Sequence, residues 1–321
     1  MSIGSIKIVS FLPSATEILY EIGAGNQVVG VTHECHHPKE AKSKPKVINS
    51  SFEASTMSSK EIDNKIVELF ANGKDIYIIN EQILKELKPD LIVAQGICEV
   101  CSPFTKEIKR AISVLEYNPK VIVLDPHNVS DILDNITEIA TNIGKINEGN
   151  NLVGLLEDKI NRIKKITELK TNIEDLPKIL CLEWIDPFFT AGHWVPEMVE
   201  IAGGINGLSK PKEQSRRTSL EEIKKFDPDK IILMPCGFNI DRTIKEYKST
   251  TRLNNNQEWT NLRAIKNNEL YVVDAGSYFS KPGPRTITGI EILAKIISPN
   301  EFEHITIPEN SYSKLILDDL N

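Results

Sequence analysis

The sequence lacks the features that would place it in a membrane, on nucleic acid or in a disulfide framework. Its apolar runs, such as residues 76–79 and 231–234, are far shorter than the roughly 20 residues that a bilayer-spanning helix needs. Lys and Arg total 38 against 45 Asp and Glu, a formal net charge of −7, so the basic excess of a general nucleic-acid-binding protein is missing. The five cysteines are odd in number and irregularly spaced, which favours reduced thiols.

Two further absences concern location and catalysis. Residues 1–13 carry no basic stretch, apolar core or small-residue cleavage site of a secretory leader. As written, the chain is therefore expected in the cytoplasm, and outside it if a start methionine has replaced a leader. The sequence contains no G-x-x-x-x-G-K-[ST], G-x-G-x-x-G, H-E-x-x-H or G-x-S-x-G motif, so we do not expect an enzyme.

What the sequence does contain is an internal repeat. A length of 321 residues and a content of 40% hydrophobic and 26% charged residues are typical of about two globular domains. Lys88-Pro89-Asp90 precedes an apolar strand, and Asp227-Pro228-Asp229 precedes another. Residues 7–26 and 178–206 each show a strand, a loop, a helix and a glycine cap, and residues 121–125 resemble 270–274. The two halves of the chain therefore predict two similar lobes.

The strand and helix patterns define the predicted architecture. Because the strands are β-branched and apolar without alternation, we expect parallel sheets covered on both faces. Ser130 is a good N-cap for a helix that ends at Gly144, and a second helix over residues 148–169 would be about 33 Å long. Its apolar face carries Leu152, Leu155, Leu156, Ile160, Ile163 and Ile166.

The predicted fold class is therefore α/β: two Rossmann-like lobes with mainly parallel sheets, joined by a single long helix. The predicted boundaries are an N-terminal lobe over residues 1–128, linking helices over 129–172, a C-terminal lobe over 173–300 and a C-terminal tail over 301–321. A single stiff helix permits only a small tilt between two lobes. We expect a monomer.

The segments after the predicted strands are rich in aromatic, thiol and imidazole groups. Ligands of open parallel sheets bind beyond the carboxyl ends of the strands. Four of the five cysteines, two of the three tryptophans and four of the six histidines fall in these segments, which makes them plausible walls of a ligand cleft. The segments are residues 13–16, 33–38 and 95–103 in the first half, and 183–187, 192–194, 235–238 and 278–280 in the second.

Several motifs resemble a known family. Phe11-Leu12-Pro13-Ser14-Ala15-Thr16-Glu17, the two Pro-Asp motifs and the long helix resemble the cobalamin-binding, iron-siderophore-related substrate-binding proteins of ABC importers, over about residues 6–298. A more specific set resembles a leaderless branch commonly labelled cobalamin-binding. That set consists of His33-Glu34-Cys35, residues 98–101, 181–184, 192–197, 234–238 and 279–285. The resemblance implies a periplasmic-binding-protein-like fold of the helical-backbone metal-receptor type. Exported members that bind haem or siderophores share that fold.

The resemblance implies reversible binding of cobalamin or a related corrinoid in the cleft between the lobes, and an ABC permease as a possible partner. Stacking on a flat macrocycle needs aromatic area, and polar contacts would bind its amide and phosphate groups. The candidate ligand-binding residues are Ser14, Glu34, Cys98, Glu99, Glu183, Trp184, His193, Trp194, Arg217, Phe238, Tyr278, Phe279 and Arg285. Each aromatic side chain could instead fill a lobe core, each carboxylate could pair with Arg216 or Arg217, and the arginines could form ion pairs.

A second interpretation concerns metal and thiol chemistry. Cys98 and Cys101 form a C-x-x-C motif, and Cys35 and His33 could complete a site for zinc or iron if the two loops meet. No second cysteine pair follows at a metal-finger spacing, so small buried thiols are the simpler interpretation. The alternative functions are therefore a cytosolic metal- or thiol-dependent enzyme on the same scaffold, or a protein that binds haem, a siderophore or another metal chelate.

Overall fold

A computed structural model describes residues 6–96, 105–169, 175–250, 253 and 256–316. The chain divides into two compact units. The first comprises residues Met1–Met57, Glu61–Pro126 and Ser130–Leu155, and the second Ser58–Lys60, His127–Val129 and Leu156–Asn321. The short segments 58–60 and 127–129 thus belong to the second unit, although they begin helices that continue in the first.

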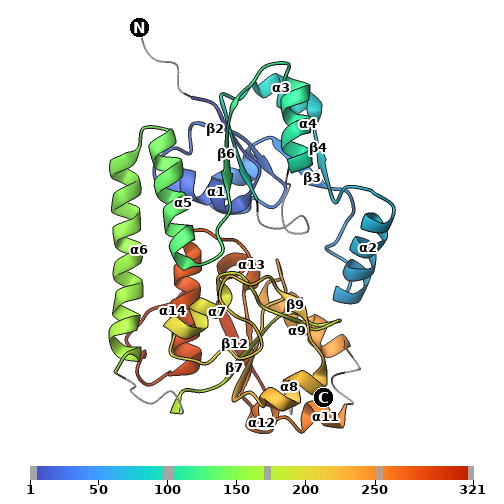
Figure 1. Ribbon diagram of the computed structural model, residues 1–321, viewed down its shortest axis with the longest axis vertical. Helices are drawn as coiled ribbons and strands as arrows, with labels where there is room; N and C mark the ends of the chain where they lie inside the picture. The colour runs from blue at the N-terminus through green and yellow to red at the C-terminus, as the bar shows by residue number, and fades with distance from the viewer. Residues whose placement is uncertain (1–5, 97–104, 170–174, 251–252, 254–255, 317–321) are drawn as a thin grey trace. The chain divides into compact units, whose positions relative to one another are not determined.

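The first unit contains a six-stranded sheet with the order β4-β3-β2-β1-β5-β6 (Figure 1). All neighbours are parallel except β3 and β4. Its strands are β1 (Ile8–Ser10), β2 (Val28–Thr32), β3 (Lys46–Ser50), β4 (Tyr77–Ile79), β5 (Leu91–Gln95) and β6 (Lys120–Leu124). The helices of this part of the chain are α1 (Pro13–Glu21), η1 (Lys39–Ser43), α2 (Ser59–Ala71), α3 (Glu81–Leu87), α4 (Thr105–Leu115), α5 (Val129–Asn142) and α6 (Ile146–Thr167).

Helices cover the first sheet because its strands are apolar on both faces. Val9, Ile92 and Ala94 pack with α3 and α4, which lie side by side in Figure 1. Helix α1 starts at Pro13 directly after β1 and buries Ile18 and Leu19 completely. Helix α1 packs against β1 and β2.

The second unit contains a six-stranded sheet with the order β12-β11-β10-β7-β8-β9. The inner strands β7, β10 and β11 are parallel, and β8, β9 and β12 are antiparallel to their neighbours. The strands are β7 (Ile179–Trp184), β8 (Phe189–Thr190), β9 (Arg216–Arg217), β10 (Lys230–Leu233), β11 (Leu270–Val273) and β12 (Tyr312–Leu315). The helices are α7 (Val195–Ile201), α8 (Leu220–Phe226), α9 (Ile240–Ser249), α11 (Gln257–Thr260), α12 (Arg263–Lys266), α13 (Ala275–Tyr278) and α14 (Arg285–Ile297).

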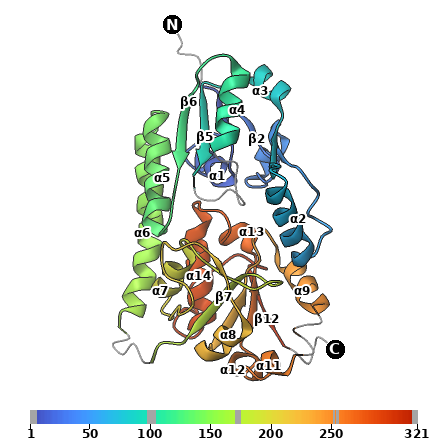
Figure 2. The same ribbon diagram turned by 45° about the vertical axis from the view of Figure 1, so that its right-hand side comes forward.

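The core of the second unit is largest on the sheet face covered by α8, α9, α11 and α12. Trp259 is fully buried there and stacks on Phe188, with the ring centroids 5.4 Å apart. On the other face α7 packs against α14, as Figure 2 shows, and Gly204 lies close to Ile179 and Ile297. Both faces of the inner parallel strands are therefore covered, which fixes the loops at their carboxyl ends.

This architecture confirms the predicted fold class of two α/β units with mainly parallel inner strands. The long helix is α6, which has 22 residues and has its amino-terminal part in the first unit and its carboxyl-terminal part in the second. Leu155, placed on the apolar face by the sequence, is 65% exposed because it lies at the margin of that face. Within the described residues, no helix is both long and apolar enough for a membrane span.

Candidate functional site

Four loops at the carboxyl ends of the second unit's strands are joined by hydrogen bonds. The Cys236 N–H donates to the Glu183 carbonyl over 3.0 Å, which links the ends of β10 and β7. The Gly237 N–H donates to Ser280 Oγ over 3.0 Å, and the Trp194 indole donates to the Phe279 carbonyl over 2.8 Å. The structure therefore brings together the strand-end segments that the sequence singled out in the second half.

The candidate aromatic side chains of the second unit differ in exposure. Trp184 is partly exposed, and its ring meets that of Phe238 edge-on with the centroids 5.5 Å apart. Phe238 and Phe279 are each 2% exposed and Trp194 is 6% exposed. In this unit Trp184 and Tyr278 are therefore the candidate aromatics with accessible surface, and the other three are buried.

His193 lies in a strained turn that two backbone bonds stabilise. Its φ of 56° is in the left-handed region. The backbone N–H of His193 donates to the Glu213 carbonyl over 2.6 Å, and the Lys212 N–H donates to the His193 carbonyl over 3.0 Å. The turn holds the imidazole 5.6 Å from the indole of Trp194, measured between ring centroids.

His127 is a candidate site residue that the sequence analysis missed. Its ring centroid is 6.4 Å from that of His193. Two residues after His127, the backbone N–H of Val129 donates to Glu197 Oε2 over 2.8 Å, so a carboxylate of α7 fixes the start of α5. The sequence signal was available, because His127 follows strand β6 as the other candidates follow theirs, but residues 125–128 were assigned to the end of the lobe.

Two candidate arginines each lie near an aromatic ring. Arg217 is exposed on β9, with its guanidinium carbon 5.5 Å from the ring centroid of Phe189. Arg285 is half-buried in the first turn of α14, and its guanidinium carbon lies 5.9 Å from the Tyr278 centroid. The half-buried guanidinium group of Arg285 is the better placed of the two to bind an anion beside the strand ends.

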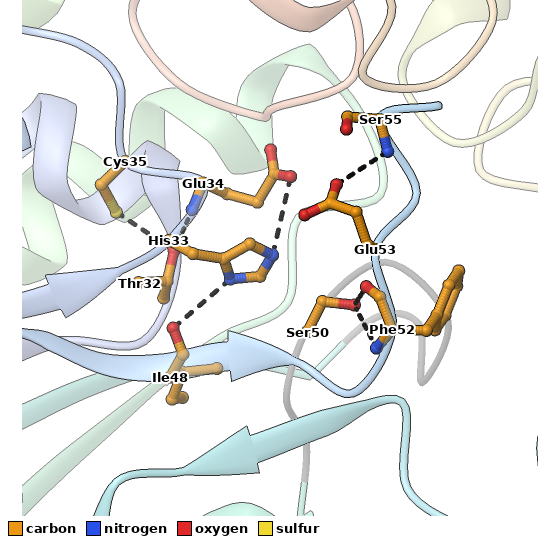
Figure 3. Close-up of polar contacts among 9 residues, drawn as sticks. All are labelled: Thr32, His33, Glu34, Cys35, Ile48, Ser50, Phe52, Glu53 and Ser55. Carbon is orange, nitrogen blue, oxygen red and sulfur yellow. Dashed lines mark hydrogen bonds and ion pairs between the residues drawn. The ribbon is translucent and has the colours of Figure 1, made fainter. Parts of the chain in front are cut away.

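The first unit has an acidic group of side chains of its own after the ends of β2 and β3. His33 Nδ1 lies 3.3 Å from the Ile48 carbonyl, and its Nε2 lies 3.8 Å from Glu34 Oε1. The side chain of Glu34 is 45% exposed. Figure 3 shows the carboxylate of Glu53, which accepts the Ser55 N–H over 2.9 Å, pointing toward Glu34 and His33. Glu53 was not among the predicted site residues, since the sequence did not place a strand directly before it.

The thiols that the structure describes are mostly enclosed. Cys35 is fully buried, and its Sγ lies 3.1 Å from Thr16 Oγ1 and 3.3 Å from Thr32 Oγ1. In Figure 3 the Cys35 side chain and the His33 ring point in different directions. Burial raises the pKa of the Cys181 thiol, which disfavours a metal-binding thiolate.

The remaining candidates are Ser14 and Glu183, which are buried or half-buried, and three residues of the segment 98–101. Ser14 lies in the first turn of α1 and is 1% exposed. Glu183 is half-buried, and its Oε2 lies 3.4 Å from the Gly192 N–H that donates to it. Cys98, Glu99 and Cys101 lie outside the described residues. Among the residues that are described, no three His, Cys, Asp or Glu side chains form a group able to hold a metal ion.

Comparison with known proteins gives consistent matches along most of the chain. A family model described as periplasmic binding protein matches residues 8–276. An uncharacterized ABC transporter substrate-binding lipoprotein, YvrC of Bacillus subtilis (strain 168), is 27% identical over 303 residues, which cover 92% of this chain and 81% of the relative. The vitamin B12-binding protein of Vibrio vulnificus (strain CMCP6) is 23% identical over 296 residues, covering 89% of this chain and 87% of that protein.

A solved structure shows the same fold. The periplasmic haem-binding protein RhuT from Roseiflexus sp. RS-1, in its apo form, matches with a TM-score of 0.68 and 20% identity. The match covers 93% of this chain and all of that chain, 100%. At this identity the likeness concerns the fold alone.

Proposed function

This chain belongs to the periplasmic binding protein family, and on that premise we propose that it is the substrate-binding protein of an ABC transporter and that it binds cobalamin or a related corrinoid. Membership confirms the resemblance drawn from the sequence. The relatives and the similar structure are named for binding and transport, not for catalysis, so the alternative of a metal- or thiol-dependent enzyme has no support from them.

The observation that carries the choice of a corrinoid is the acidic character of the strand ends in the first unit. Glu34 and Glu53 present carboxylates beside His33, and carboxylates accept hydrogen bonds from amide groups. The rim of a corrin ring carries amide side chains, whereas haem and ferric citrate present carboxylates that would be repelled. The similar structure named for haem binding therefore shares the fold, while the side chains here favour an amide-bearing ligand.

The second unit supplies groups that suit the rest of such a ligand. Trp184 offers a partly exposed indole for stacking on the macrocycle, with Phe238 packed against its edge. The guanidinium group of Arg285 suits the single phosphate of the nucleotide loop of cobalamin. All direct ligand contacts, those of Ser14, Trp194, Phe279 and Arg217 included, and enclosure of the ligand by both halves stay predictions.

Calorimetry and visible spectra of the purified protein with four separate ligands test the proposal. Cyanocobalamin and dicyanocobinamide should bind with a Kd below about 10 μM, and hemin and ferric citrate at least about tenfold more weakly. Arg285→Ala should weaken the binding of cyanocobalamin. The binding of dicyanocobinamide, which lacks the nucleotide loop, should be unaffected. Lys281→Ala, on the loop before α14, is the matched control. Binding of hemin in preference to both corrinoids would reject the proposed ligand class.

The proposed role also predicts where the protein is located in the cell. The substrate-binding protein of an importer meets its ligand outside the cytoplasmic membrane, and the Bacillus relative is named a lipoprotein. We therefore expect the chain in the extracytoplasmic or membrane-anchored fraction of its source cells. Recovery only from the cytosolic fraction would count against the transport role while leaving corrinoid binding to be judged by calorimetry.

A further inference from the structure

Helix α9 is linked to the Trp184–Phe238 pair by two side chains: Arg242 lies over the Phe238 ring, and Glu246 reaches Trp184 through Ser59. Arg242 and Glu246 are four residues apart and therefore lie on the same face of the helix. We propose that Arg242 and Glu246 are positioning residues for ligand binding, which fix the Trp184–Phe238 pair in the orientation that a flat ligand needs.

Glu246 holds the first residue of helix α2. Glu246 is 8% exposed, and one oxygen of its carboxylate accepts both the Ser59 backbone N–H, over 2.8 Å, and the Ser59 hydroxyl. A buried carboxylate needs such donors, and the first turn of a helix has backbone N–H groups without intrahelical partners. The contact therefore satisfies both groups and fixes Ser59 beside helix α9.

Ser59 in turn holds Trp184. The Trp184 indole N–H donates to the Ser59 carbonyl over 3.1 Å. An indole has a single hydrogen-bond donor, so this bond sets the rotation of the ring about its side-chain torsions. Two consecutive hydrogen bonds thus connect the Glu246 carboxylate to the aromatic side chain at the end of β7.

Arg242 fixes the second ring of the pair. Its guanidinium carbon lies 3.7 Å from the centroid of Phe238, and Phe238 meets Trp184 at an interplanar angle of 61°. The helix that carries Arg242 is itself fixed, because Tyr247 is fully buried and its hydroxyl accepts the Trp259 indole N–H over 3.1 Å. The orientations of both rings are therefore set by side chains of one rigid helix, α9.

The consequence for function is preorganisation. A ring already oriented before the ligand arrives loses less side-chain entropy on binding, so affinity rises without a direct contact from α9. This inference rests on the proposed function only in assuming that Trp184 touches the ligand. The placement of Trp184 by Glu246 can be measured without any ligand.

The test is a double-mutant cycle between Glu246→Ala and Trp184→Phe, with cyanocobalamin as the probe. Glu246→Ala should weaken cyanocobalamin binding about tenfold in the parent protein and less than about twofold in the Trp184→Phe background. Glu246→Gln retains the acceptor oxygen and should restore affinity to within about twofold. Lys245→Ala, on the exposed side of α9, is the matched control and should leave affinity unchanged.

A readout without ligand accompanies the cycle. The emission of Trp184, taken as the difference between each protein and its Trp184→Phe counterpart, should become more accessible to acrylamide in Glu246→Ala and return to the parent value in Glu246→Gln. An equal affinity loss in both tryptophan backgrounds, or unchanged Trp184 emission, overturns the inference. If the parent protein binds no corrinoid while the emission responds as expected, the proposed function fails and the placement of Trp184 by α9 is supported.

Discussion

The two units build the same parallel core but continue from its first strand in different ways. In the first unit helix α1 follows β1, and the chain returns as β2 parallel to β1. In the second unit β7 turns directly into the antiparallel strand β8, and helix α7 comes afterwards. The chain leaving α7 makes one parallel bridge, between Lys178 and Ile205, before it turns away. Strand β8 therefore occupies the place beside the first strand that β2 takes in the first unit.

This difference distinguishes the elements that form the core of both units from the hairpin that carries candidate site residues. The shared elements are strands and helices that bury apolar side chains, whereas the inserted β7–β8 hairpin carries Trp184 at one end and leads to His193 and Trp194 at the other. An added hairpin can change these side chains without disturbing the parallel core. Three of the candidate ligand-binding side chains of the second unit, Trp184, His193 and Trp194, thus lie on or beside a feature that the first unit does not repeat.

The largest predicted effect concerns the hairpin. A Cβ on Gly192 would lie 2.2 Å from the backbone nitrogen of Ser215 and 2.8 Å from the Glu213 carbonyl oxygen. Gly192→Ala must therefore displace residues 213–215, which hold the His193 turn, and we expect a loss of about 3 kcal/mol in unfolding free energy. Urea denaturation measures this loss.

A glycine of the long helix α6 gives the matched control for that substitution. Gly154 lies within α6, and apart from its chain neighbours and the backbone of its own helix no described atom lies within 4 Å of the position where its Cβ would be. Gly154→Ala should be stabilising by up to about 1 kcal/mol, because alanine favours the helix. Equal effects of the two substitutions would mean that the hairpin is not closely packed on residues 213–215.

The next effect concerns a hydrogen bond from a backbone N–H to an aspartate carboxylate that occurs in both units. Asp90 Oδ2 accepts the Lys7 backbone N–H over 2.8 Å, and Asp229 Oδ2 accepts the Lys178 backbone N–H over the same 2.8 Å. Each aspartate thereby ties the Pro-Asp turn to the residue before the unit's first strand. Asp229 also forms an ion pair with Arg263, whose Nη1 lies 2.9 Å from its Oδ1.

We therefore expect Asp229→Ala to lower the unfolding free energy by about 2 kcal/mol and Asp90→Ala by about 1 kcal/mol. Thermal denaturation with Asp134→Ala, an exposed aspartate of α5, as control measures both. A larger loss for Asp90 would show that the ion pair with Arg263 contributes nothing and that the Lys7 contact is the stronger tie.

The two Pro-Asp turns could be predicted from the sequence, and the β7–β8 hairpin could not. Proline followed by aspartate after a helix marks both turns, and the left-handed φ values of Lys88 and Asp227, 48° and 49°, confirm that each helix ends there. By contrast, β8 consists of Phe189 and Thr190 alone, too short for any alternation to appear. Ser59 contacts Glu246 and His127 lies beside His193, and both partners are far along the chain, so no local pattern could predict these contacts.

The smallest predicted effect concerns the outer strand of the second sheet. Strand β12 pairs with β11 in the second unit, whereas within the described part of the first unit no strand follows the equivalent β6 in the sheet. The sequence predicted only a polar tail over residues 301–321, and in the structure Leu315 is the one buried residue of β12. A network around Glu269 holds β12: its carboxylate accepts hydrogen bonds from Lys230 and Tyr271 and, over 2.7 Å, from Lys314 of β12.

Burial raises the pKa of Glu269, but the hydrogen bonds from Lys230, Lys314 and Tyr271 outweigh it and hold the pKa below its ordinary value. A lowered acid pKa stabilises the fold above the unfolded-state value of about 4.3, and this contribution disappears as the pH falls through the folded-state pKa. Glu269→Gln should therefore lower the unfolding free energy by under about 1 kcal/mol at pH 7 and by progressively less below about pH 4. Urea denaturation at several pH values measures this difference, with the exposed Glu309→Gln as control. A difference that stays constant or grows toward low pH would mean that the charge of Glu269 does not hold β12, and the added strand would then depend on its backbone pairing with β11 alone.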